Sequence, residues 1–205
     1  MPRNRDVFIN CPYDAAYQDL FHAICFTLLY NGYRPRCALE SVGSETSRLD
    51  KICGLIGKCA AGIHDISRVE ASPNGLPRLN MPFELGLFIA CKRFGGPRHR
   101  GKRVLVIDRD PHTHHASLSD LSGYDPLAHD GTIEGIIGAV SSWLRSGTRE
   151  DIAGPLQVSR DFRLFRHDLP SICVPMGFDE RTLAFGNLVH FMFQWIGEWD
   201  LSLAS

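Results

Sequence analysis

The first two thirds of the chain alternate between short apolar runs and segments with helical hydrophobic spacing. The apolar runs end at turn residues and predict buried strands at residues 7–9, 33–39, 62–67 and 104–108. Apolar residues that recur every three and four positions predict helices at residues 17–28, 49–59, 83–90 and 133–144. Alternation of this kind predicts an α/β fold with a parallel sheet and helices on both faces. Pro35 makes its strand an edge strand or an irregular one, because proline cannot donate to a sheet ladder.

We expect an α/β domain over residues 1–146 and a mainly helical extension over residues 147–205 that packs on it. A polar connector follows the last helix of the alternating pattern, and helical spacing resumes beyond it. The final helix is rich in aromatic residues, namely Phe185, Phe191, Phe193, Trp195 and Trp199. Buried aromatics also dominate subunit interfaces, so we expect a homo-oligomer as well.

Composition narrows the range of partners. The 205 residues are 44% hydrophobic and 22% charged with a net charge of −1, which gives no electrostatic reason to expect nucleic acid or a membrane as partner. No signal-peptide pattern and no membrane-length apolar run is found, so we expect a soluble, cytoplasmic protein. The seven cysteines form no CxxC pair and are expected to be small buried residues: Cys11, Cys25, Cys37, Cys53, Cys59, Cys91 and Cys173.

Polar residues cluster where the predicted strands end. Ligands of open α/β sheets bind beyond the carboxyl ends of the strands. The residues that the pattern brings to this edge are Asn10, Cys11, Tyr13 and Asp14 after the first strand, Glu40 after the second, Asp65, Ser67 and Arg68 after the third, and Asp108, Arg109 and Asp110 after the fourth. Two carboxylates in one cleft, Asp65 and Glu84, would have their pKa values pushed apart, as acid–base chemistry requires.

Glu84 lies in the segment around which the other candidates gather. Pro82 suits the first turn of a helix, and the macrodipole there favours an ionised Glu84. Phe83, Leu87 and Ala90 share one face and predict a buried stripe, with Glu84 at its edge. Position alone leaves two interpretations open, a helix-capping carboxylate or a group aimed into a cleft.

The other candidates also have structural interpretations. Asp65, Asn10 and Asp14 could cap turns or helices, and Arg48, Lys51 and Arg68 could be solvated surface charges. Cys11 has no signature of a Cys–His pair, and no glycine-rich phosphate loop follows the first strand. The histidines of the long loop, His112, His114 and His115, have no acidic or cysteine partner at ligand spacing, so we predict neither a metal site nor a bound cofactor.

Several motifs resemble those of TIR domains and nucleoside 2-deoxyribosyltransferases over roughly residues 5–145. Residues 6–14 (DVFINCPYD) resemble the first TIR box, and residues 32–37 the second strand. A strand ending in Asp65, followed by Glu-Leu-Gly-x-x-x-Ala at residues 84–90 and another strand, is similar to the transferase pattern. The resemblance implies a flavodoxin-like fold and cleavage of an N-glycosidic bond with Glu84 as the catalytic glutamate.

This resemblance leads to a first functional hypothesis, a nucleotide N-glycosidase similar to NAD glycohydrolases, with a possible role in bacterial anti-phage defence. Glu84 would stabilise the ribose cation and Asp65 would orient the ribose or Glu84. The nucleotide would contact Asn10, Cys11, Tyr13, Asp14, Ser67, Asn80 and Met81, with Arg48 or Arg68 facing phosphate.

Two alternatives stay open. Enzymatic TIR domains carry a Trp-Cys pair before the glutamate, whereas residues 80–83 here are Asn-Met-Pro-Phe, which favours a non-catalytic nucleotide-sensing or assembly module. A nucleoside 2-deoxyribosyltransferase is the third hypothesis, although an uncharged nucleoside would not need Arg48 or Arg68.

Overall fold

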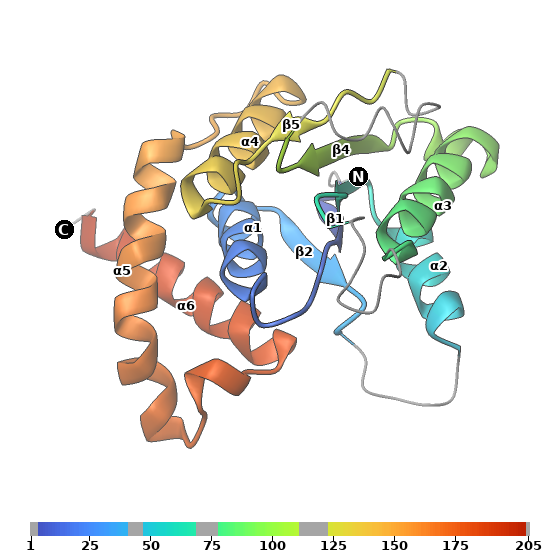
Figure 1. Cartoon of the computed structure of the whole chain (residues 1–205). Helices are drawn as coiled ribbons and strands as arrows, with labels where there is room; N and C mark the ends of the chain where they lie inside the picture. Colours follow the sequence, from blue (N-terminus) through green and yellow to red (C-terminus); the bar gives the residue numbers. More distant parts are fainter. Residues whose placement is uncertain (1–3, 41–46, 69–77, 111–122, 204–205) are drawn as a thin grey trace.

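A parallel sheet forms the centre of the computed structural model, which describes residues 4–40, 47–68, 78–110 and 123–203 (Figure 1). The strands in these residues are β1 (Asp6–Asn10), β2 (Arg34–Cys37), β3 (Ala61–Asp65), β4 (Arg103–Asp108) and β5 (Leu127–Ala128). Their order is β2-β1-β3-β4-β5, and every neighbouring pair is parallel. The chain thus reverses its direction of winding between β1 and β3, as in flavodoxin-like folds. The predicted α/β fold is confirmed.

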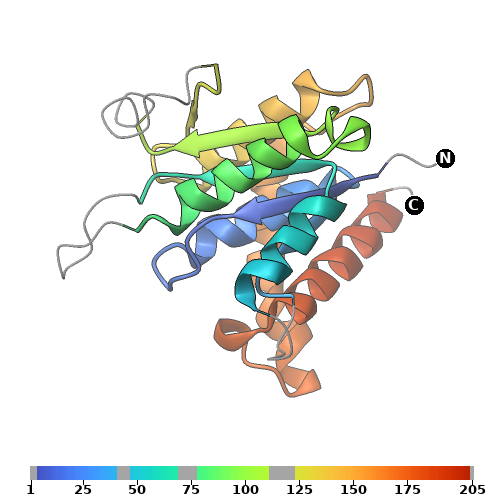
Figure 2. The same ribbon diagram turned by 90° about the vertical axis from the view of Figure 1, so that its right-hand side faces the viewer.

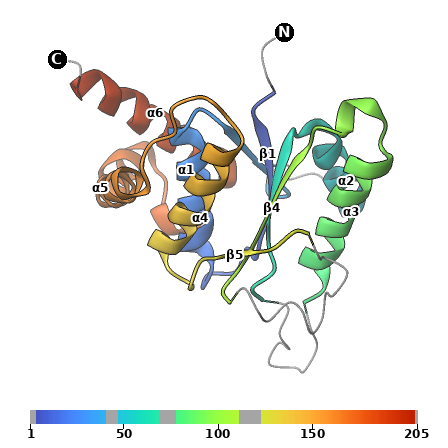
Figure 3. The same cartoon turned by 90° about the horizontal axis from the view of Figure 1, so that it is seen from above.

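Helices cover both faces of the sheet. One face carries α1 (Gln18–Tyr30) and α4 (Ile133–Ser146), and the other carries α2 (Arg48–Lys58) and α3 (Asn80–Phe94) (Figure 3). Figure 2 views the second face, with α3 in green and α2 in cyan in front of the strands. The remaining helices are α5 (Pro155–Cys173) and α6 (Phe185–Leu203), with short 3-10 turns η1 (Pro97–His99), η4 (Val174–Met176) and η5 (Glu180–Thr182).

Burial explains which strands the sequence pattern predicted. All five residues of β1 and all five of β3 are buried, which produces the unbroken apolar runs of central strands. The edge position of β2 agrees with its Pro35. The prediction missed β5, because its two residues, Leu127 and Ala128, are exposed and form no apolar run.

The predicted buried stripe of α3 is wrong. Phe83 is 55% exposed, and Leu87 and Ala90 are only partly buried. The buried residues of this helix are Met81, Glu84, Leu85 and Phe88. The ring of Phe88 packs against the sheet, 6.4 Å from the ring of Phe8 between centroids, and this contact sets the helix rotation. Glu84 therefore lies on the buried face rather than at its edge.

The extension shares its core with the α/β layers. The ring of Phe26 on α1 lies 5.3 Å from that of Phe162, 5.5 Å from that of Phe165 and 5.9 Å from that of Trp195. One buried cluster runs through α1, α4, α5 and α6. Of the aromatic residues expected to pack, Phe193 is 67% exposed, and the side chain of Trp199 lies outside the described residues. The domain boundary at residue 146 stays a prediction.

The cysteines and the helices bear on two further expectations. All seven cysteines are free and most are buried, but Cys53 is exposed and Cys91, at the margin of a buried cluster, is only partly buried. None of the described helices is both long and apolar enough to cross a membrane.

Replacing Phe165 by alanine should lower the free energy of unfolding by about 3–5 kcal/mol, because the ring is fully buried between α1 and α6. Leu164 precedes it on the same helix and is 37% exposed, so Leu164→Ala should cost clearly less. Urea unfolding of both variants measures the difference. Equal losses would show that the extension does not share the core.

Candidate functional site

A buried amide joins the two central strands to α3. Asn10, the last residue of β1, is 2% exposed, and its Nδ2 donates to the backbone carbonyl of Met81 at 2.8 Å. The same nitrogen lies 3.0 Å from Nδ1 of His64, the register partner of Asn10 on β3. Both hydrogens on Nδ2 thus bind groups within the protein. The side-chain oxygen takes part in neither contact. Asn10 positions the start of the helix that carries Glu84.

His64 is held as a neutral ring. Burial lowers its pKa to about 3, and its ring packs edge-on to Phe8 and Phe88. Because Nδ1 accepts from the Asn10 amide, the proton of the neutral ring is on Nε2. That nitrogen is buried and has no hydrogen-bond partner within the described residues. His64 is therefore a structural acceptor for Asn10 and not an acid or a base near neutral pH.

Glu84 is a buried carboxylate at the carboxyl edge of the sheet. The residue is 7% exposed, and burial raises the pKa of its carboxyl, an effect that the positive charge of Arg48 partly offsets. Among the described residues, no hydrogen bond or ion pair to this carboxylate is found. Its charge contributes to the raised pKa values of Cys11 and Tyr13, so it lies near the end of β1.

Asp65 has the opposite environment, a carboxylate that is buried but well supplied with donors. It accepts hydrogen bonds from the hydroxyl of Tyr17 and, at 2.7 Å, from the backbone N–H of Ser67. Its Oδ2 also lies 3.3 Å from Nε2 of His129, and both side chains are at most 1% exposed. Since Nδ1 of His129 accepts from the N–H of Gly131 at 3.1 Å, the neutral ring carries its proton on Nε2, facing Asp65.

Sequence reasoning missed Tyr17 and His129. The spacing of Tyr17 assigned it to the apolar face of α1, where its ring is indeed buried, and this concealed the role of the hydroxyl. His129 lies directly after β5, the strand that the pattern did not predict.

The two expected carboxylates lie near one thiol. Burial is the main cause of the raised pKa of Cys11, and the negative charges of Asp65 and Glu84 raise it further. The structure therefore brings both acids close to Cys11.

An arginine pair ties the loop after β1 to the segment after β3. Asp14 accepts from Arg68 at 2.8 Å and from Arg78 at 2.7 Å. Partial burial alone would raise the pKa of Asp14, but hydrogen bonds and charge from Arg78 and Arg68 lower it. The guanidinium of Arg68 also lies 5.8 Å from the ring centroid of Tyr17. Arg68, expected to face phosphate, is thus held at this edge by protein contacts, with a second arginine beside it.

The remaining predicted site residues are less informative. Burial, followed by the charge of Asp65, raises the pKa of Cys11, so its thiol is not a nucleophilic thiolate near neutral pH. The Tyr13 hydroxyl donates to the carbonyl of Ile9 at 2.9 Å.

The other predicted site residues differ in exposure. Asn80 and Arg48 are exposed, and Met81 is buried. The histidines expected to bind no metal, His112, His114 and His115, lie outside the described residues.

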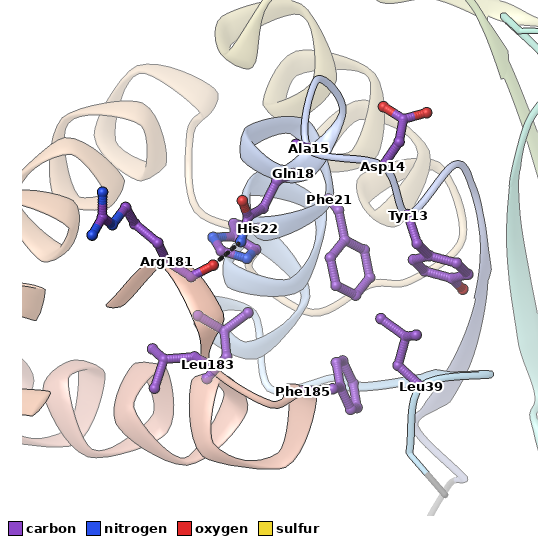
Figure 4. Close-up of a pocket in the computed structure, with 11 residues that line it drawn as sticks. Tyr13, Asp14, Ala15, Gln18, Phe21, His22, Leu39, Arg181, Leu183 and Phe185 are labelled. Atoms are coloured by element: carbon purple, nitrogen blue, oxygen red, sulfur yellow. Dashed lines mark hydrogen bonds between the residues drawn. The ribbon is translucent and has the colours of Figure 1, made fainter. Parts of the chain in front are cut away.

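Two pockets flank the start of α1. The first has a volume of about 310 Å³ and includes Ser67, Arg68, Arg109 and His129 in its wall. The second, of about 280 Å³, is closed by the extension and is mostly apolar (Figure 4). Its wall includes the rings of Tyr13, Phe21 and Phe185, with Phe21 5.3 Å from Tyr13 and 5.9 Å from Phe185 between ring centroids.

Comparison with known proteins adds no relative. No family model, no curated protein and no solved structure matches this chain. Within the described residues, no group of three or more His, Cys, Asp or Glu side chains is placed to hold a metal ion. The likeness to TIR domains and deoxyribosyltransferases stays a prediction from the motifs.

Replacing Tyr17 by phenylalanine should lower the free energy of unfolding by about 1–3 kcal/mol, because the buried carboxylate of Asp65 loses a donor. Tyr13→Phe is the matched control, and it removes a hydroxyl that donates to a neutral carbonyl, so it should cost only about 0.5–1.5 kcal/mol. Denaturant unfolding at pH 7 compares the two. A smaller loss for Tyr17→Phe would contradict the role given to this hydroxyl.

Proposed function

We propose that this protein is a nucleotide N-glycosidase, with NAD or a related nucleotide as substrate and Glu84 as its catalytic carboxylate. The observation that carries the proposal is the environment of Glu84, which is 7% exposed at the carboxyl edge of the sheet and has its pKa raised by burial. A carboxylate kept out of water is most effective at stabilising a developing positive charge.

The chemistry follows from that placement. As the N-glycosidic bond of the substrate breaks, the base leaves with the bonding electrons and the anomeric carbon of the ribose becomes an oxocarbenium-like cation. The carboxylate of Glu84 would stabilise this cation or bond to it covalently. Water then adds to the carbon and gives up a proton, which completes hydrolysis. Asp65, with its donors fixed, would keep the adjacent loop in place for the ribose.

A nucleotide-sensing module without turnover is the second candidate. It is favoured by the segment that opens α3, where Asn-Met-Pro-Phe stands in place of the Trp-Cys pair of enzymatic TIR domains. Leu79 and Phe83 in this segment are 58% and 55% exposed, which leaves apolar surface for assembly with another chain. Such a module would bind nucleotide and release no base.

The test is incubation of the full chain with NAD, NADP and deoxynucleosides plus a free base, with mass spectrometry of the released base. Glu84→Gln should lower kcat/KM by at least about 100-fold, because it keeps the shape of the side chain and removes the charge. Glu150→Gln is the matched control, since Glu150 forms a surface ion pair with Arg5 and should leave the rate within about twofold.

Wild-type turnover by Glu84→Gln would end the glycosidase proposal. Nucleotide binding with no base released by the wild type would replace it with the sensing module. Exchange of bases on a deoxynucleoside would identify a deoxyribosyltransferase instead.

A further inference from the structure

We infer that the 310 Å³ pocket at the carboxyl ends of β3 and β4 binds the phosphate groups of the nucleotide. Three separate segments build its charged wall: Arg68 follows β3, Arg109 follows β4, and the turn from β5 into α4 contributes His129, Gly131 and Ile133. The inference rests on the proposed function, because it names the part of that substrate which this pocket would hold.

The wall carries more positive than negative charge. Arg68 lines the pocket and pairs with Asp14, which Arg78 also contacts; Asp14 and Arg78 are not among the lining residues. Asp19 also lines the pocket, but its carboxylate pairs with Arg166 at 2.9 Å. Asp65 accepts hydrogen bonds from two residues of the wall, Tyr17 and Ser67. Arg109 adds a further exposed cation to the wall.

The start of α4 adds hydrogen-bond donors. Thr132 caps the helix through its side chain, which accepts from the N–H of Gly135 at 3.0 Å. The N–H groups of Ile133 and Glu134 come before the first N–H that bonds within the helix, that of Ile136, which donates to the carbonyl of Thr132. The helix dipole favours an anion there. The side chain of Glu134 points to Arg163, 3.2 Å away between charged atoms, and is 56% exposed.

A buried polar atom in the wall is an independent sign of a ligand. Nε2 of His129 is inaccessible to solvent, and it has no hydrogen-bond partner within the described residues although Asp65 lies 3.3 Å away. Unsatisfied buried donors are rare in native proteins and mark sites where a water or ligand oxygen completes the bonding. One water between this nitrogen and a phosphate oxygen in the pocket would supply that acceptor.

Arg109 lies beside the turn that leads into α4. Its guanidinium packs over Gly131, where the φ angle is +78° and a Cβ atom would lie 3.1 Å from Nε of the arginine. A residue with a side chain at position 131 would therefore be strained and would crowd the arginine. Glycine at this position leaves room for the guanidinium beside the start of α4.

The test is the binding of inorganic pyrophosphate to the full chain, measured by calorimetry at low salt. Arg109→Gln should weaken binding by about tenfold, the usual effect of losing one charge-assisted contact. Arg100→Gln is the matched control, because Arg100 is exposed just before β4, at the other end of the strand, and should leave the Kd within about twofold. Circular dichroism verifies that both variants are folded.

Glu84→Gln should bind pyrophosphate as the wild type does, which separates this site from the catalytic carboxylate. Equal affinity of Arg109→Gln and wild type, or no pyrophosphate binding at all, would overturn the inference even if base release is observed. Binding that depends on Arg109 in a protein that releases no base would support the phosphate site and refute only the glycosidase activity.

Discussion

One buried hydrogen-bonding group, the side-chain amide of Asn10, determines how α3 meets the sheet. Its two hydrogens bind a ring nitrogen on β3 and a carbonyl in the first turn of α3. The helix cannot rotate or slide at this end without leaving buried donors and acceptors unpaired, which costs about 1–3 kcal/mol for each group. Phe88 fixes the same helix two turns further on. With both points held, Glu84 has to lie on the buried face.

The two acidic residues of the site, Asp65 and Glu84, have different surroundings. Asp65 accepts hydrogen bonds from the hydroxyl of Tyr17 and the backbone N–H of Ser67, so it is a stable part of the scaffold. Glu84 is buried, and among the described residues the more distant charge of Arg48 is what offsets the loss of water. Two carboxylates with such different burial and hydrogen bonding are typical of sites in which one performs the chemistry and the other positions the substrate.

The sequence predicted most of the sheet and the edge on which the candidates gather, because central parallel strands form unbroken apolar runs. It could not predict β5, whose pairing depends on neighbours rather than on burial. The rotation of α3 was wrong because Phe83 and Met81 are both apolar, and only the contacts of Phe88 and Asn10 decide between the two faces. Tyr17 and His129 were missed because their partner, Asp65, is distant in sequence.

The most direct test of this account is the titration of Glu84 itself, followed by carbon-13 NMR of its carboxyl group in the full chain. The constraint from Asn10 predicts a pKa above the ordinary 4.5 in the wild type, because burial disfavours the charged form. It also predicts a shift back towards 4.5 in Asn10→Ala, where α3 is released from the sheet. A wild-type pKa at or below 4.5 would contradict the account.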